Sequence, residues 1–489
     1  MKRRLALVVL AVVGAVAPLL ALEIGLRVLY PQTRIMTVDE RFGSRPQPNL
    51  NLRRAYGGHE RVVTIRTNAL GLRGAETPAA KLPGVKRVLA LGDSFTFGDA
   101  VELDETWPRR LEARLNESGG PRRVEVVNAG VSGWGTGHQL LFARAFADRL
   151  APDLVVLAFS VVNDVLDNLC VDEATYRPRT NAPCFTVDGG RLRFEPPAPA
   201  PPRVRHASLV GGSRVAQLLV AQIKRLTLSR PAVVGLARDL GVPVELPYLP
   251  ATIASWYDDR YRERGWELTR RLLGELKRTL DARSIPLVVL VVPASVQAEG
   301  DGGGKRAILE MLGGGNAAVH AFLADPTKPQ RLLRDYCADA RVPCVDPLPA
   351  LLERRAQGDT VYYPLDQHWT PAAHDLAASL LVETDIVGGL LSWGDYRSPP
   401  SPPRSEPSRG TRDGPRGLDP LTGSEIIGGL SKPPKPPALG APRGGARPHP
   451  WCADAPVKAV ALLGNRIRSR APMASARPGP TERRGRCGW

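Results

Sequence analysis

The chain has 489 residues, of which 43% are hydrophobic, 6% aromatic and 24% charged, with 48 Gly and 47 Pro. These values are ordinary for a globular protein and exclude a chain that is wholly disordered or collagen-like. The net charge is +17, but residues 397–489 alone hold 17 Lys and Arg against 6 Asp and Glu, so the rest is close to neutral and nucleic acid is not an expected partner.

The N-terminus has the pattern of an export signal. Lys2 to Arg4 precede an unbroken apolar run from Leu5 to Leu22, which is long enough to cross a membrane as a helix. A cleavable signal peptide has a shorter apolar core and small residues before its cleavage site, whereas Leu19 to Leu22 are mostly bulky. We therefore expect an uncleaved signal anchor over residues 1–30, with cleavage as the alternative. The positive flank predicts a single-pass protein of the cell membrane whose residues after Glu23 are extracytoplasmic, in the periplasm.

Residues 31–396 alternate between strand-like and helix-like segments. Five short apolar runs rich in β-branched residues predict buried strands at Arg87–Leu91, Val124–Asn128, Leu154–Ser160, Leu287–Val292 and Val342–Val345. Helical patterns lie between them, including Trp107–Glu117, His138–Arg149 and Tyr261–Arg283. This alternation predicts an α/β fold, a three-layer α/β/α sandwich with a five-stranded parallel sheet. Ligands of such folds bind beyond the carboxyl ends of the strands.

The first predicted strand is followed by a candidate nucleophile. Gly92, Asp93 and Ser94 place a serine hydroxyl on the turn between this strand and the next helix, at the carboxyl edge of the sheet. A serine that merely caps the helix is the alternative.

Three further polar segments follow later strands or close the folded part. Asn128 to Gly135 form a glycine-rich loop whose backbone N–H groups can approach a substrate oxygen. Asn163, after the third strand, offers a side-chain amide to developing negative charge. Asp366 and His368 place an imidazole beside a carboxylate that can orient it.

An insertion separates the third and fourth strands. It opens with the Pro-rich segment 196–202 and runs to about residue 250. We expect this insertion to be a lid or side element. Its apolar stretches either pack against the main domain or contact a membrane surface.

The motifs together resemble the SGNH hydrolase superfamily, the GDSL esterases and lipases, over about residues 40–390. Its four blocks occur here in the family's order, as Gly92 to Ser94, Asn128 to Gly133, Asn163-Asp164, and Asp366 to His368. The resemblance implies a flavodoxin-like fold and assigns each block's roles to the matching residues. The implied nucleophile is Ser94, the general base is His368 and its orienting acid is Asp366, while Ser94, Gly133 and Asn163 form the oxyanion hole.

Two departures from the family pattern bear on function. Many members have the Asp three residues before the His, but Asp366 is two before His368, a spacing similar to the alginate O-acetyltransferase-type branch. Val162 replaces the glycine that commonly precedes the block-three Asn. We expect Trp369 and His374, which follow at the start of a helix, to be structural.

Six cysteines fit an oxidising compartment without requiring one, since none forms a CxxC pair. The spacings Cys170–Cys184 and Cys337–Cys344 allow local disulfides, and buried free thiols are the alternative. Residues 397–489 contain 18 Pro and 13 Gly, which predicts a disordered Pro-, Gly- and Arg-rich tail.

The expected function is a membrane-anchored extracytoplasmic serine esterase that removes O-acyl groups from a carbohydrate or another small ester through an acyl-enzyme. An O-acyltransferase that moves acetyl groups onto a cell-envelope polysaccharide is the first alternative, because the two reactions share that intermediate. A non-catalytic glycan-binding module is the alternative of another class. No cofactor is expected, and no metal, because the seven His form no HxxxH pattern or Cys/His cluster.

Overall fold

The computed structural model describes residues 2–29, 34–56, 61–78, 81–117, 123–170, 182–197, 249–298, 316–364, 366–384 and 386–391, together with isolated positions between 213 and 222 and at 309. The predicted tail 397–489 and most of the predicted insertion at 196–250 lie outside the described residues.

Five parallel strands form the central sheet, in the spatial order β11-β10-β7-β5-β6. In chain order they are β5 (Val85–Gly92), β6 (Arg123–Gly130), β7 (Leu154–Ser160), β10 (Leu287–Val292) and β11 (Cys344–Val345). The predicted five-stranded parallel sheet is therefore confirmed. Strand β11 begins later than the sequence indicates, because the N–H of Val342 bonds to the carbonyl of Cys337 and Pro343 has no N–H to offer.

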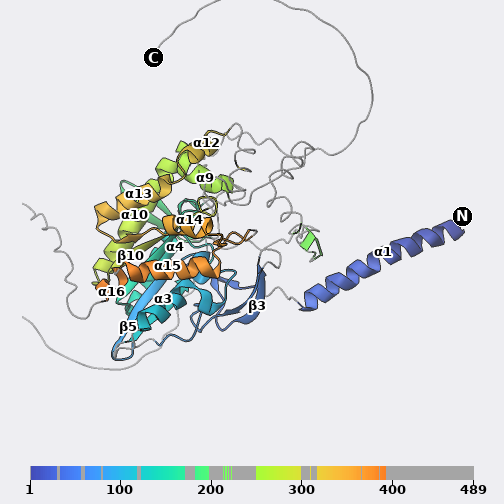
Figure 1. Ribbon diagram of the computed structural model, residues 1–489, viewed down its shortest axis with the longest axis horizontal. Helices are drawn as coiled ribbons and strands as arrows, with labels where there is room; N and C mark the ends of the chain where they lie inside the picture. The colour runs from blue at the N-terminus through green and yellow to red at the C-terminus, as the bar shows by residue number, and fades with distance from the viewer. Residues whose placement is uncertain are drawn as a thin grey trace, which may run out of the picture. The chain divides into compact units, whose positions relative to one another are not determined.

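Helices cover both faces of the sheet (Figure 1). One face carries α4 (Thr136–Leu150), α10 (Asp259–Asp281) and α13 (Lys328–Ala340), and the other carries α3 (Trp107–Asn116), α14 (Leu348–Ala356) and α15 (Pro371–Glu383). The shorter described helices are α2 (Ser94–Phe97), α5 (Asp164–Asn168), α9 (Leu249–Tyr257), α12 (Ala317–Ala324), α16 (Ile386–Leu390) and the 3₁₀ turn Leu103–Glu105.

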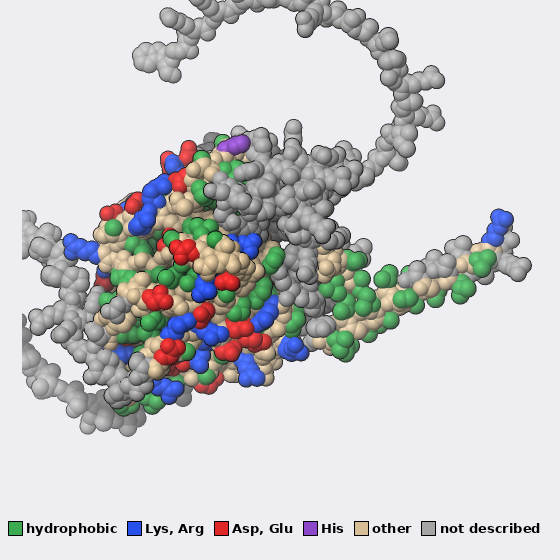
Figure 2. Space-filling model, viewed as in Figure 1, with side chains coloured by type: hydrophobic (Ala, Val, Ile, Leu, Met, Phe, Trp, Pro, Cys, Tyr) green, Lys and Arg blue, Asp and Glu red, His purple; other side chains and the backbone are tan. Residues whose placement is uncertain are grey.

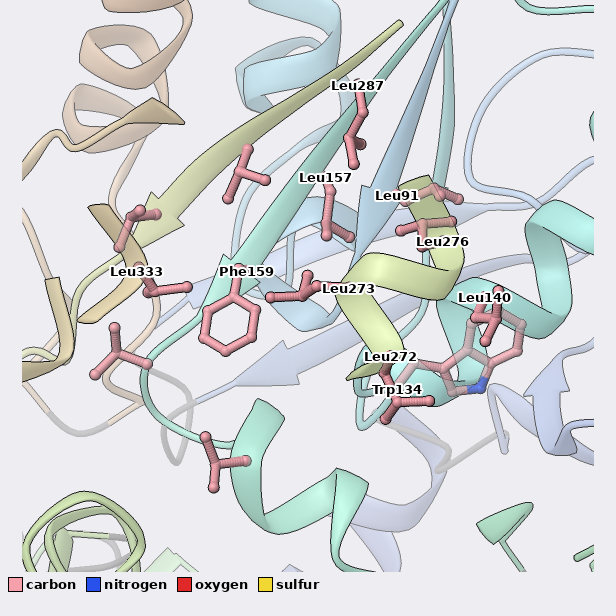
Figure 3. Close-up of a cluster of buried hydrophobic side chains, with 14 of the residues drawn as sticks. Leu91, Trp134, Leu140, Leu157, Phe159, Leu272, Leu273, Leu276, Leu287 and Leu333 are labelled. Carbon is pink, nitrogen blue, oxygen red and sulfur yellow. The ribbon is translucent and has the colours of Figure 1, made fainter. Parts of the chain in front are cut away.

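Strand β7 shows how the two layers share one sheet. All seven of its residues are buried, and successive side chains point to opposite faces, as strand geometry requires. Leu157 and Phe159 pack with the α4 and α10 leucines drawn in Figure 3, whereas Val156 and Ala158 pack with the α3 and α15 layer. Each fully buried Leu or Phe contributes roughly 1.5–3 kcal/mol. Burial on both faces fixes the sheet and the edge on which its loops meet.

Three antiparallel hairpins stand outside this sheet, in addition to the five predicted strands. Strands β1 (Met36–Asp39) and β2 (Gly43–Pro46) form the first, β3 (Asn51–Tyr56) and β4 (Arg61–Arg66) the second, and β8 (Cys184–Asp188) and β9 (Arg191–Glu195) the third.

Both cysteine pairs are bonded. The Cys170–Cys184 disulfide joins the end of α5 to β8, and the Cys337–Cys344 disulfide joins α13 to β11. The structure thus shows two disulfides, whereas the spacing alone is equally compatible with free thiols.

The N-terminal segment is a helix, α1 (Lys2–Leu29). Many of its described side chains are hydrophobic and exposed (Figure 2). Leu10 and Leu19 are two of them. Within the residues that the structure describes, no helix is both long enough and apolar enough to span a membrane. The signal anchor stays a prediction.

Candidate active site

Ser94 is the first residue of the short helix α2, which follows strand β5. The side chain of Asp93 caps this helix by accepting a hydrogen bond from the N–H of Phe95 at 2.9 Å. Ser94 is half-buried at the carboxyl end of β5. The turn therefore presents its hydroxyl at the sheet edge where the sequence predicts it.

Three of the predicted site residues meet through their side chains. The Oγ of Ser94 lies 2.8 Å from Nε2 of His368, and Nδ1 of the same ring contacts Oδ1 of Asp366. Ser94 and His368 are 274 positions apart in the chain, so the fold, not local sequence, makes this contact. A carboxylate on Nδ1 leaves Nε2 free to accept the serine proton.

A left-handed residue makes the short Asp-x-His spacing work. Gln367, between the two triad residues, has φ +65°, a conformation uncommon outside glycine. Backbone hydrogen bonds hold it, from the N–H of Gln367 to the carbonyl of Tyr363 and from the N–H of Tyr363 to the carbonyl of His368, both at 2.9 Å. The turn brings Asp366 and the imidazole of His368 side by side.

The electrostatic surroundings favour the charged form of His368. Burial alone would lower its pKa, but the hydrogen bond and charge of Asp366, with the charges of Asp99 and Asp93, raise the pKa to about 9. These charges thus stabilise an imidazolium at His368.

Asp93 is a buried acid directly beside the nucleophile. Its side chain is fully buried, and burial is the main reason that its pKa rises to about 7. One oxygen accepts from Phe95, while Oδ2 has no hydrogen-bond partner among the described residues.

The end of β6, where the glycine-rich segment begins, packs closely on the Ser94 turn. Asn128 donates through Nδ2 to the carbonyl of Thr96 at 2.7 Å, and its Oδ1 accepts from the N–H of Gly130 at 3.0 Å. A Cβ at Gly130 would lie 2.3 Å from the backbone nitrogen of Phe97, so only glycine fits there. Gly133, farther along the loop, is exposed and has φ +80°.

Asn163 stands at the end of β7, on the other side of β5. It precedes α5 and is largely buried, and its Nδ2 donates to Oδ2 of Asp167 at 2.7 Å. Strand order places Gly133 and Asn163 on the two loops that flank the Ser94 turn. No described hydrogen bond links either residue to Ser94 directly.

A second buried carboxyl supports this loop. Asp164 accepts from the N–H of Ser160 at 2.6 Å and from Oγ1 of Thr136 at 3.3 Å. Burial, with the nearby charges of Asp93 and Asp167, raises its pKa well above the usual range.

Trp369 and His374 are fully buried beside the triad. The rings lie 5.6 Å apart in an edge-on arrangement, and Nδ1 of His374 accepts from the backbone N–H of Trp107 at 3.2 Å. Burial lowers the pKa of His374 to about 3, which keeps this imidazole neutral as a helix-capping acceptor. Its contacts are those of a structural residue.

Sequence patterns missed one carboxylate at this edge. Asp99, just after α2, accepts from the phenol of Tyr56 at 2.7 Å and from the hydroxyl of Ser132 at 2.9 Å. An acidic residue five positions after the nucleophile was the one available signal for Asp99. Nothing in the sequence pairs it with Tyr56, 43 positions earlier.

Parts of the chain are similar to known proteins. An arylesterase of Vibrio mimicus is 35% identical over 72 residues, which are 15% of this chain and 35% of the relative, so the chain spans about a third of that protein's length. Among solved structures, TesA matches with 14% identity and a TM-score of 0.31, over 63% of this chain and 100% of TesA. The acetyl xylan esterase AlAXEase matches with 9% identity and a TM-score of 0.32, over 61% of this chain and 100% of that one.

Residues 90–320 match the GDSL-like lipase/acylhydrolase family. The match contains Ser94, Gly133 and Asn163 and ends before Asp366 and His368, which the fold nevertheless carries to the serine. This stretch of the chain is therefore similar to the GDSL-like lipase/acylhydrolase family.

Proposed function

We propose that the protein is a serine hydrolase of ester bonds that works through an acyl-enzyme. One observation carries this proposal: the hydroxyl of Ser94 lies 2.8 Å from Nε2 of His368, whose other ring nitrogen contacts Asp366. This is the arrangement that activates a serine nucleophile.

The chemistry follows from these atoms. As the Oγ of Ser94 attacks the ester carbonyl, its proton passes to Nε2 of His368, and Asp366 stabilises the resulting imidazolium. The imidazolium then gives this proton to the leaving alcohol, and an acyl-Ser94 ester remains. Water attacks the acyl group with His368 again as base, which releases the carboxylic acid and restores the free serine.

The negative oxygen of the tetrahedral intermediate needs hydrogen-bond donors. We assign this role to the N–H groups of Ser94 and Gly133 and to the side-chain amide of Asn163. An amide nitrogen carries two hydrogens, so the bond from Asn163 to Asp167 fixes its direction and leaves one donor for the substrate.

Acyl transfer is a second candidate, favoured by the two-residue spacing of Asp366 and His368. An acceptor hydroxyl, such as that of a cell-envelope polysaccharide, would then attack acyl-Ser94 in place of water. The two outcomes share every step up to that intermediate.

We further propose an extracytoplasmic, membrane-anchored enzyme acting on O-acyl groups of carbohydrates or on small esters. The positively flanked apolar segment from Leu5 to Leu22 supports export, and the Cys170–Cys184 and Cys337–Cys344 disulfides fit an oxidising compartment. We infer a glycan substrate from that location.

Hydrolysis of p-nitrophenyl acetate by the purified full chain tests the proposal. The Ser94→Ala variant should release no nitrophenol, whereas Ser255→Ala should behave as wild type, because that buried hydroxyl only donates to the carbonyl of Thr252. Turnover by Ser94→Ala would contradict the assignment. If wild type binds glycans but hydrolyses no ester, the protein is instead a binding module.

A second assay separates hydrolysis from transfer. Wild type is supplied with the same ester and an acetyl-free oligosaccharide, and the sugar is analysed by mass spectrometry. Acetylated sugar that requires Ser94 would identify a transferase, and free acetate alone would identify a hydrolase.

A further inference from the structure

We propose that Asp99 is a positioning residue that fixes the glycine loop, with its residue Gly133, against the Ser94 turn, and that the β3–β4 hairpin, which precedes the family-matched region, holds Asp99 in place. This inference rests on the proposed function. It adds to the site a group that the sequence motifs do not contain.

The two oxygens of Asp99 are held from two different elements. Oδ1 accepts from the phenol of Tyr56, in β3, at 2.7 Å, and Oδ2 accepts from Oγ of Ser132, in the glycine loop, at 2.9 Å. Charged acceptors form stronger hydrogen bonds than neutral ones. The carboxylate therefore ties β3 to the glycine loop from a point five residues after Ser94.

The glycine loop depends on such outside contacts. A Cβ at Gly133 would meet no atom within 4 Å, so little packs against this residue on its side-chain face. Its neighbours carry the anchors instead: Ser132 bonds to Asp99, and Nε1 of Trp134 donates to the carbonyl of Ser44 at 3.0 Å. A backbone N–H can stabilise an oxyanion only if it is held before the reaction.

Both anchors lead to residues outside the family-matched region. Tyr56 and Ser44 precede residue 90, where the match begins. Tyr56 is buried, and burial together with the charge of Asp99 raises the pKa of its phenol, which keeps it a hydrogen-bond donor. We infer that residues 34–56 and 61–75 are a supporting layer of the site and not a separate module.

A buried arginine fixes the turn from which Asp99 projects. Arg73 is 2% exposed, and its guanidinium donates to the carbonyls of Phe97 at 2.8 Å and Val101 at 2.6 Å, and also to that of Gly98. Because the backbone on both sides of Asp99 is held, its carboxylate has little freedom to move away from Ser132.

Asp99 also acts on the catalytic base through its charge. The charged groups that influence the pKa of His368 are Asp366 from its own turn and Asp99 and Asp93 from the two ends of the Ser94 turn, and the charge of His368 in turn lowers the pKa of His374 in α15. The negative charge of Asp99 contributes to the raised pKa of His368. The positioning and electrostatic roles therefore predict different responses to substitution.

Three variants separate these roles. Ser132→Ala removes the tie to the loop and keeps the charge, Asp99→Asn removes the charge and keeps the size, and Asp99→Ala removes both. Asp148→Asn is the matched control, because it deletes the same unit of charge from an exposed ion pair with Arg283. All are assayed as full chains on p-nitrophenyl acetate over a pH series, with melting temperature as the folding check.

We expect Ser132→Ala and Asp99→Ala to lower kcat by ~10-fold or more with little change in KM, since small displacements of catalytic groups are costly. Asp99→Asn should move the rising limb of kcat/KM to lower pH, and Ser132→Ala should not. The double variant Asp99→Ala with Ser132→Ala should be no slower than Asp99→Ala alone, because both act through one contact.

Folded Ser132→Ala with wild-type kcat would overturn the positioning role, and this mild variant decides the question even if Asp99→Ala fails to fold. Asp99→Asn with an unmoved pH limb would overturn the electrostatic role. Absence of hydrolysis by wild type, or unchanged hydrolysis by Ser94→Ala, would instead contradict the proposed function.

Discussion

Ser295 donates a hydrogen bond from its hydroxyl to Oε1 of Gln367 at 3.2 Å. The bond ties the loop after β10 to the one residue between Asp366 and His368. This bond holds the side chain of Gln367 in place. The backbone of the same residue, at φ +65°, takes a conformation that most residues avoid. The short spacing of the triad acid and base depends on this turn.

The turn predicts opposite outcomes for two substitutions. Gln367→Gly should keep kcat within a few-fold of wild type, because glycine adopts positive φ without steric cost. Gln367→Val should lower kcat by ~10-fold or more, because a β-branched residue resists this conformation and displaces Asp366 from the imidazole. Steady-state kinetics of the two variants test this. A valine variant with wild-type kcat would show that the turn does not set the triad geometry.

Asn163→Ala should lower kcat by ~10²-fold or more while KM changes little, since this is the scale of losing one oxyanion donor. Asp167→Asn should have a smaller effect in the same direction, because it weakens the bond that orients Asn163 without removing the donor. Steady-state kinetics on p-nitrophenyl acetate provide the measurement. A change confined to KM in Asn163→Ala would remove this residue from the oxyanion hole.

The two disulfides should differ in their effect on catalysis. Replacing Cys337 and Cys344 by Ala should lower the free energy of unfolding by about 2.5 kcal/mol, on the chain-entropy estimate for a short loop, and leave kcat unchanged. Replacing Cys170 and Cys184 should lower both, because Cys170 lies at the end of α5, the helix that begins after Asn163. Denaturant unfolding and kcat are measured together, and equal kcat values for both double variants would refute the distinction.

The sequence predicts β7 and β10 with their observed limits, because runs such as Leu287–Val292 are continuous and apolar and are buried on both faces. It misses β3, because Asn51–Tyr56 includes two adjacent exposed arginines and shows no regular alternation. Short hairpins of this kind are stabilised by their packing against the domain, which local pattern does not encode.

The candidate site, like the fold, can be predicted from the sequence only in part. Ser94, Asn163 and His368 stand in motifs that a reader of the sequence can find, and strand order predicts that the loops carrying Ser94 and Asn163 lie at one edge. The contact between Tyr56 and Asp99 has no such signal, since neither residue belongs to a motif and their pairing depends on how the hairpin packs.

The pH dependence of the reaction follows from His368. The base must be neutral to accept the proton of Ser94, and the pKa of His368 is raised to about 9, chiefly by the hydrogen bond and charge of Asp366, which exceed the lowering effect of burial. Activity should therefore rise with pH, and the midpoint of the rising limb of kcat/KM should lie on the alkaline side of neutrality.

Asp366→Asn tests this assignment with the sign worked out. Removing the carboxylate charge destabilises the imidazolium, while burial still opposes protonation, so the pKa of His368 falls and the remaining limb moves to lower pH. The rate itself should fall sharply, because the amide no longer holds the ring in the orientation that points Nε2 at Ser94. Asp148→Asn serves again as the charge control and should leave the profile in place. A wild-type profile that is flat from about pH 5 to 9, with chemistry rate-limiting, would mean that His368 is not the base.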